Sequence, residues 1–278
     1  MESKIIPTDL KAEIIGRLAE AGISQIQVAS FVNPRRVPQM ADAEELIQML
    51  PKRENLVYTG LALNAKGVER AFRAGLNAVE VSVSASDTHS RKNAGMSRAQ
   101  ALEQGREMVR LARENRMHII ASVQCAFGCV YEGEISSETV LETIRMYANA
   151  GADRISLADT TGMAHPLLLK RLVPAVQKEI GQIPLGLHLH DTRGLGLVNL
   201  MTGLEFGIHH FDTAFGGLGG CPFVTGAAGN IATEDTLHLL ESLHIKTGID
   251  MRKVAECSRK MAEFLDRLFP GRLYRMES

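Results

Sequence analysis

Two histidines two residues apart, His188 and His190, are the clearest candidates for chemistry in this sequence. They lie in the run LGLHLHD at 185–191, which is typical of a buried β-strand, where residues i and i+2 point to the same face. Two neutral imidazoles on one face can ligate a divalent metal ion, and two hydrogen-bonded core histidines are the alternative. Because the pair ends its strand and is followed by Asp191 and Thr192, we favour the metal pair.

Three more side chains follow strand-like runs and carry useful groups. Asp159 ends the run RISLAD and either points toward the same site or caps a local turn. The glycine-rich stretch GGLGGCPFVTGAAGN at 216–230 contains Cys221, a candidate general acid or nucleophile, and Asn230, a candidate oxygen ligand. A buried core cysteine and a loop hydrogen bond are the ordinary alternatives. No Lys-Ser/Thr follows the glycines, so the stretch is not a phosphate-binding P-loop.

A sequence pattern that recurs four times predicts the helices and strands that position these groups. Each copy is a helical stretch, a glycine and a short apolar strand, and the glycines are Gly22, Gly75, Gly151 and Gly207. We expect these glycines to end helices, where a positive φ is needed. The fourth residue after each glycine is apolar, and the fifth is polar: Gln27, Glu80, Ser156 and Asp212.

Strands alternate with helices along the whole chain. Further strands are predicted at 55–63, 118–127 and 185–191, and Ser136 and Thr233 are predicted to cap helices. This alternation predicts an α/β fold, a TIM (β/α)8 barrel forming one catalytic domain over 1–278, with an additional C-terminal helix at 250–268.

Seven strands are predicted, one fewer than a closed barrel has, and the missing strand would be the first. Such a barrel has two unpaired strand edges. Two hypotheses explain it: Met1 is an internal methionine and the strand is encoded upstream, which we favour, or the chain is a truncated paralogue.

Composition excludes several classes of protein. A net charge of −1 over 278 residues, without basic stripes, argues against a nucleic-acid partner. No apolar run is long enough for a membrane span, and no targeting signal is visible. Four cysteines are too few for a disulfide framework, and we interpret Cys125 and Cys129 as structural residues of a cytoplasmic protein.

The glycine-rich stretch closely resembles the signature loop of the 3-hydroxy-3-methylglutaryl-CoA lyase family. Other segments resemble that family in the same order: SFVNPRRVPQMAD, CAFGCVYEG, ISLADTTG, HLHDTRG and GNIATED. Related isopropylmalate and homocitrate synthases share the H-x-H strand and lack the GGCP loop, so the lyase branch is favoured. The resemblance implies a metal-dependent retro-Claisen cleavage of 3-hydroxy-3-methylglutaryl-CoA to acetyl-CoA and acetoacetate, a step of leucine degradation and ketone-body formation.

The resemblance also implies a role for each candidate residue. His188, His190 and Asn230 would ligate Mg2+ or Mn2+, with His188 also counted as catalytic. Asp159 would handle the proton of the substrate hydroxyl, and Cys221 would protonate the departing enolate. The substrate, an acyl-CoA, would also contact Gln27, Ser30, Ser156 and Asn93. A homodimer is a reasonable expectation.

Two departures from the family pattern limit these expectations. The family's first strand ends in Arg-Asp-Gly-Leu-Gln, and here MESKIIPTDLKAE aligns with the segment after that motif. Gln27 stands where the family usually has a glutamate. We therefore expect the chain as written to bind metal weakly and to have little lyase activity. The alternatives are a lyase or aldolase acting on a related 3-hydroxyacyl-CoA, and an inactive barrel that only binds ligands.

Overall fold

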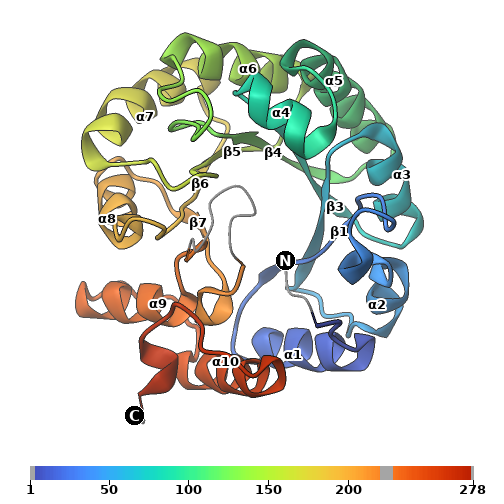
Figure 1. Cartoon of the computed structure of the whole chain (residues 1–278), viewed down its shortest axis with the longest axis vertical. Helices are drawn as coiled ribbons and strands as arrows, with labels where there is room; N and C mark the ends of the chain where they lie inside the picture. Colours follow the sequence, from blue (N-terminus) through green and yellow to red (C-terminus); the bar gives the residue numbers. More distant parts are fainter. Residues whose placement is uncertain (1–3, 220–227, 277–278) are drawn as a thin grey trace.

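A computed structural model describes residues 4–219 and 228–276. They contain seven parallel strands in the order β1 to β7, curled around a common axis, which confirms the predicted barrel and its strand count (Figure 1). Within these residues the sheet is open between β1 and β7. The strands are β1 (Gln25–Ser30), β2 (Val57–Ala62), β3 (Ala78–Ser84), β4 (His118–Gln124), β5 (Arg154–Ala158), β6 (Leu185–His188) and β7 (His210–Asp212).

Helices form a ring outside the sheet (Figure 1). They are α1 (Thr8–Glu20), α2 (Ala43–Met49), α3 (Ala65–Arg73), α4 (Asp87–Ala94), α5 (Arg98–Glu114), α6 (Ser137–Ala150), α7 (Pro166–Ile180), α8 (Gly196–Glu205), α9 (Thr233–Ser242) and α10 (Met251–Leu265), with 3-10 turns at Pro38–Met40, Phe215–Gly217 and Leu273–Arg275. None of the helices in the described residues is long and apolar enough to cross a membrane.

The ring of helices closes although the sheet does not. α10 lies beside α1 and also contacts α9, so it joins the two ends of the ring (Figure 1). Buried apolar side chains make this junction, among them Ile14 and Leu18 of α1 and Val254 and Met261 of α10. The apolar face shared by α1 and α10 therefore holds the β1 and β7 sides of the barrel near each other.

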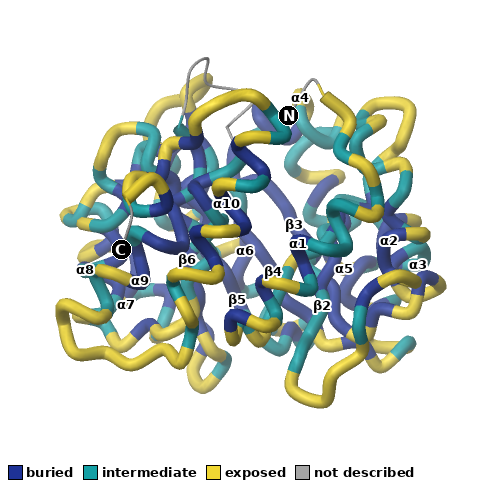
Figure 2. The backbone as a smooth tube through the Cα atoms, turned by 90° about the horizontal axis from the view of Figure 1, so that it is seen from below, coloured by how far each residue is buried: buried dark blue, intermediate teal, exposed yellow. Residues whose placement is uncertain are grey.

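Apolar side chains of the strands pack outward against the helices. Val79, Val81 and Val83 of β3 are at most 2% exposed and belong to the main core, and the inner strands are buried along most of their length (Figure 2). The four repeated glycines all have φ between +72° and +99°, as predicted for residues that end helices. Alternation along each strand then turns the polar fifth residue toward the inside of the barrel.

The helix caps agree with one prediction and contradict another. The Ser136 hydroxyl accepts a hydrogen bond from the Thr139 N–H at 3.1 Å and caps α6, as expected. Thr233 is not a cap, because α9 begins at Thr233 itself and Ala232 occupies the cap position. The Thr233 hydroxyl lies 2.8 Å from the Thr213 hydroxyl, so it ties the start of α9 to the end of β7.

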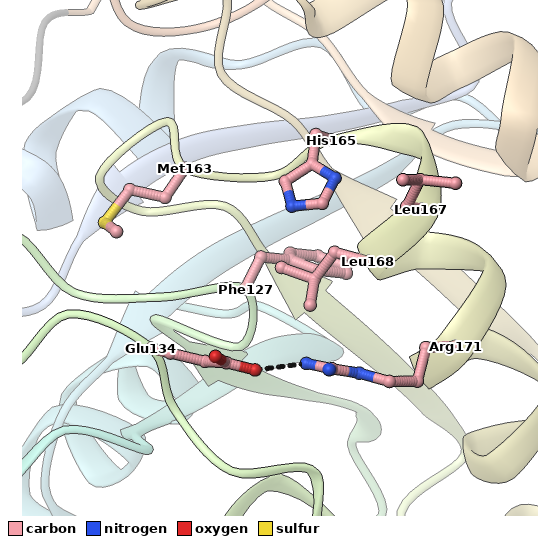
Figure 3. Close-up of a pocket in the computed structure, with 7 residues that line it drawn as sticks. All are labelled: Phe127, Glu134, Met163, His165, Leu167, Leu168 and Arg171. Atoms are coloured by element: carbon pink, nitrogen blue, oxygen red, sulfur yellow. Dashed lines mark hydrogen bonds and ion pairs between the residues drawn. The ribbon is translucent and has the colours of Figure 1, made fainter.

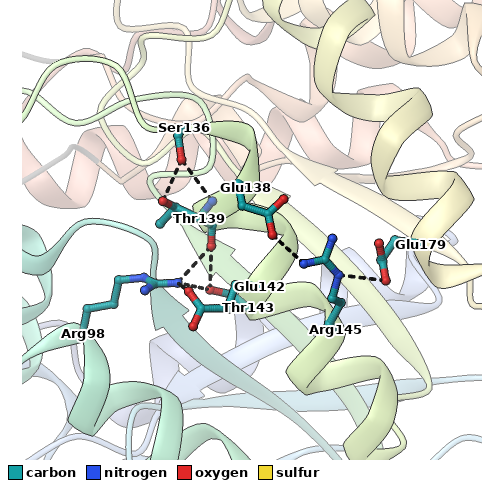
Figure 4. A network of polar contacts seen from close by, with 8 residues as sticks. All are labelled: Arg98, Ser136, Glu138, Thr139, Glu142, Thr143, Arg145 and Glu179. Carbon is teal, nitrogen blue, oxygen red and sulfur yellow. Dashed lines mark hydrogen bonds and ion pairs between the residues drawn. The ribbon is translucent and has the colours of Figure 1, made fainter.

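Charged side chains join the outer helices α5, α6 and α7 (Figure 4). Arg98 at the start of α5 donates to Glu142 of α6 at 2.7 Å. Arg145 of α6 bonds Glu138 on its own helix at 2.6 Å and Glu179 of α7 at 3.0 Å. At least one side chain of each pair is exposed, so each pair adds about 0.2–1 kcal/mol at most. Burial of the apolar faces, rather than these pairs, holds the ring together.

Close packing at Gly60 predicts a specific sensitivity of the fold. A Cβ at Gly60 of β2 would lie 2.4 Å from the ring of Phe31, the buried residue that follows β1. We expect Gly60→Ala to lower the free energy of unfolding by about 1–3 kcal/mol through overpacking, measured by urea denaturation. Gly16→Ala is the matched control, since a Cβ there meets nothing within 4 Å. That change should stabilise α1 by about 0.5–1 kcal/mol. Equal effects at both positions would contradict the packing argument.

Candidate active site

His188 and His190 lie together at the carboxyl end of β6, as predicted. β6 ends at His188, and His190 follows in an isolated antiparallel bridge with Asn230. Their Nε2 atoms are 3.2 Å apart and their ring centroids 5.2 Å apart, so the two imidazoles converge on one point. Burial, together with the neighbouring His188, lowers the pKa of His190 to about 3, so this imidazole is a neutral donor at physiological pH.

Asp212 orients His188, and the sequence reasoning did not assign it a role. It is the register partner of His188 on β7, and its Oδ2 lies 3.4 Å from His188 Nδ1. A carboxylate on Nδ1 turns Nε2 toward a ligand, as in many metal-binding histidines. Burial disfavours the charged form of His188, but the hydrogen bond and charge of Asp212, together with the charges of Glu80 and Asp159, outweigh it and raise the pKa of His188. The sequence signal that could have identified Asp212 is its place in the repeat, where the fifth residue after the glycine is polar.

Asn230 is brought to the histidine pair by backbone pairing. The Ile231 N–H donates to Leu189 O at 3.2 Å and the Asp191 N–H donates to Gly229 O at 2.7 Å. The Asn230 side-chain Nδ2 donates to Leu218 O at 3.0 Å, which leaves its carbonyl oxygen as the group that can act as a ligand. Cys221 lies outside the described residues.

Asp159 caps a turn, which is one of its two predicted roles, and it also presents an unpartnered oxygen in the described residues. It is 1% exposed and follows β5 directly. Its Oδ1 accepts from the N–H groups of Met163 at 2.7 Å and Ala164 at 3.0 Å, while its Oδ2 is buried without a hydrogen-bond partner in the described residues. Burial raises the pKa of Asp159 to about 7 against these hydrogen bonds. Such a carboxyl can take up or release a proton near neutral pH.

The inside of the barrel carries a second polar layer, of which the sequence reasoning assigned only Gln27 to the site. Gln27 Nε2 donates to Glu80 Oε2 at 2.6 Å, and Arg154 Nη1 donates to Gln25 Oε1 at 3.0 Å. β1 is not a neighbour of β3 or β5 in the sheet, so both contacts run across its concave side. Burial, reinforced by the charge of Asp212, raises the pKa of Glu80 to about 7.

The other predicted substrate contacts are spread along the strands. Ser30 ends β1, and Ser156 lies within β5, is 2% exposed, and its Oγ lacks a hydrogen-bond partner in the described part of the chain. Asn93 of α4 donates to Gln124 Oε1 at 3.3 Å, at the carboxyl end of β4. Gln27, Ser156 and the histidine pair are thus on strands that face one interior, and Asn93 lies at its mouth.

The side chains around the histidine pair provide some of the ligands that a divalent metal ion needs. Two adjacent ligands of an octahedral ion with bonds of about 2.1 Å lie about 3.0 Å apart, close to the observed 3.2 Å between the two Nε2 atoms. Residues 4–219 and 228–276 contain no group of three or more His, Cys, Asp or Glu side chains arranged to hold a metal. The donors present are therefore His188 and His190, with the Asn230 amide oxygen as a third.

A separate surface pocket of about 340 Å³ lies over the loops after β4 and β5 (Figure 3). It is lined by Phe127, Glu134, Met163, His165, Leu167, Leu168 and Arg171. Arg171 and Glu134 form an ion pair at its rim. Within the described residues none of the predicted site residues lines this pocket, and the Met163 N–H, which donates to Asp159, links it to the site.

The cap made by Asp159 predicts a difference between two variants. Asp159→Ala leaves the Met163 and Ala164 N–H groups unpaired, and we expect a loss of about 1–3 kcal/mol in the free energy of unfolding. Asp159→Asn keeps the acceptor oxygen, so its free energy of unfolding should fall by less than half as much as that of Asp159→Ala. Urea denaturation at constant pH measures both. Equal losses would show that the cap does not hold this loop.

His89, which anchors α4 and hence Asn93, predicts a dependence of stability on pH. It is fully buried, and its Nδ1 lies 3.0 Å from the Ser84 hydroxyl. Burial lowers its pKa from 6.5 to about 4, only partly opposed by Glu132. The neutral ring therefore contributes its full stability above pH 6.5, and up to about 3 kcal/mol of it is lost as the pH falls toward 4. His89→Asn should flatten this part of the pH–stability curve. Parallel curves for the two proteins would contradict it.

Comparison with known proteins identifies the relatives of this chain. A model of the HMGL-like family matches residues 1–261. The cytoplasmic 3-hydroxy-3-methylglutaryl-CoA lyase of Homo sapiens is 40% identical over 255 residues, which are 92% of this chain and 69% of that protein.

Solved structures agree in fold and in sequence. The HMG-CoA lyase of Bacillus subtilis superposes with a TM-score of 0.95 at 33% identity, over 99% of this chain and 92% of that one. An HMG-CoA lyase of Acinetobacter baumannii, in complex with coenzyme A and 3-methylmalate, has a TM-score of 0.93 at 38% identity, over 100% of this chain and 93% of that one. The resemblance found in the motifs is thereby confirmed, and the chain belongs to the HMGL-like family, together with the 3-hydroxy-3-methylglutaryl-CoA lyases.

Proposed function

We propose that this protein catalyses the divalent-metal-dependent retro-Claisen cleavage of 3-hydroxy-3-methylglutaryl-CoA to acetyl-CoA and acetoacetate. The observation that carries the proposal is the convergence of the His188 and His190 Nε2 atoms beside Asn230, in a chain of the HMGL-like family. The relative crystallised with coenzyme A supports an acyl-CoA ligand.

Asp159 is the group best suited to move the substrate's hydroxyl proton. Its buried Oδ2 is free to accept that proton, while Oδ1 is held by two backbone N–H groups. Loss of the proton lets the hydroxyl-bearing carbon form its carbonyl as the adjacent C–C bond breaks. The electron pair of that bond passes to the thioester enolate, and Cys221 would protonate the α-carbon of the enolate, giving acetyl-CoA.

His188, His190 and Asn230 would hold the cation, Mg2+ or Mn2+. A bound cation would polarise the substrate's oxygens and fix its orientation. Asp212 would keep the His188 imidazole turned so that its Nε2 faces the ion position.

The test is the formation of acetyl-CoA and acetoacetate from 3-hydroxy-3-methylglutaryl-CoA in Mg2+. Two proteins are compared: this chain, and a version extended upstream by a strand ending in Arg-Asp. We expect turnover by the extended protein, none after chelation by EDTA, and much weaker turnover by the chain as written, because the family's Arg-Asp is not supplied.

Variants of the extended protein test the roles of single residues. His190→Ala should lower kcat/KM at least about 100-fold, because it removes a ligand. His209→Ala is the matched control, an exposed histidine beside β7, and should stay within about twofold of the unaltered protein. Turnover that survives both EDTA and His190→Ala would refute the metal-dependent mechanism.

A related acyl-CoA is the second candidate substrate. Gln27 is uncharged and hydrogen-bonded to Glu80, which changes the polarity of one wall of the interior. A panel of 3-hydroxyacyl-CoA thioesters in the same assay separates the two substrates. Binding of coenzyme A without turnover of any of them by the extended protein would favour a barrel that only binds ligands. A cytoplasmic location and a homodimer remain parts of the proposal.

A further inference from the structure

We propose that Glu80 is a positioning residue, which orients the Gln27 side-chain amide so that its carbonyl oxygen accepts a hydrogen bond from bound substrate. The inference rests on the function proposed above and extends it to a residue pair inside the barrel.

The two side chains meet on the concave side of the sheet. Gln27 is on β1 and Glu80 on β3, with β2 between them, and Gln27 Nε2 lies 2.6 Å from Glu80 Oε2. Contact between strands that are not neighbours requires both side chains to point inward. The Ser122 hydroxyl on β4 also hydrogen-bonds Glu80, so the carboxylate is held from the far side.

This contact fixes which end of the amide is available. A glutamine amide has two N–H donors and one carbonyl acceptor, and an ionised carboxylate, the form of Glu80 at pH 8, only accepts. With Nε2 committed to Glu80, Oε1 points away from it. Gln27 is exposed, whereas Ala29, two residues further along the strand, is buried, so the Gln27 side chain is accessible to a molecule inside the barrel. A substrate hydroxyl or N–H is the complementary group.

The first experiment measures the pair itself by thermal unfolding at pH 8, with Gln27→Glu, Glu80→Gln and the double variant. Gln27→Glu places two carboxylates in contact, and we expect Tm to fall by about 3 °C or more. The double variant restores one amide and one carboxylate, and its Tm should return to within about 1 °C of the unaltered protein. Gln25→Glu is the matched control, because its partner is Arg154 and it should not lower Tm. A fall in Tm that Glu80→Gln does not reverse would overturn the pairing.

The second experiment measures the positioning role, by calorimetric titration of the full chain with 3-hydroxy-3-methylglutaryl-CoA in Mg2+. Glu80→Ala and Glu80→Gln should raise Kd about fivefold, the value of one hydrogen bond. The double variant should recover to within about twofold, because its new carboxylate at position 27 again accepts from substrate. Mn2+ affinity, followed by electron paramagnetic resonance, should change less than substrate affinity in every variant.

The outcomes distinguish this inference from the proposed function. If the unaltered chain and both Glu80 variants bind the substrate equally, the positioning role is wrong and the proposed function stands. If neither the unaltered chain nor its upstream-extended version binds the substrate, the proposed function is wrong and the positioning role falls with it. The inference is supported if both single Glu80 variants bind the substrate more weakly and the double variant binds it as tightly as the unaltered protein.

Discussion

The site depends on the packing of α1 against α10. A parallel barrel is normally held in shape by hydrogen bonds around a closed sheet, and here no strand in the described residues lies between β1 and β7. The apolar junction of the two helices closes the outer ring instead, with Lys260 of α10 bonding Glu13 of α1 at 2.5 Å. Because the ring is closed, β1 stays close enough to the opposite strands for its glutamines to reach Glu80 and Arg154.

Alternation within each strand then separates two environments. The apolar residues face helices and make the core, so the polar residues of the same strands must face the interior. A polar group in that position needs partners, which other inward side chains or water can provide. Gln27 with Glu80, and His188 with Asp212, are such partnerships. The same arrangement that satisfies buried polar groups therefore prepares a site.

Much of this could be predicted from the sequence, because the signals were local. Glycine spacing fixed the ends of helices and the starts of strands, and the H-x-H run placed His188 and His190 on one side. The pairing of Gln27 with Glu80 could not be predicted, since it depends on the curvature of the sheet and on register, which a strand pattern does not encode. The predicted Thr233 cap failed for a related reason, because its hydroxyl bonds a tertiary partner, Thr213.

Hydrogen bonds hold the described ends of the glycine-rich stretch in place, which its glycine content alone does not indicate. Glu234 is fully buried and accepts from the Gly216 N–H at 2.9 Å, while the Ser258 hydroxyl of α10 donates to the same carboxylate. At the far end the Asn230 N–H donates to Gly219 O at 3.3 Å, which brings the two ends together beside His190. One carboxylate thus links α10, the helix that closes the ring, to the stretch that supplies Asn230. Closure of the fold and placement of the candidate ligand are consequences of the same packing.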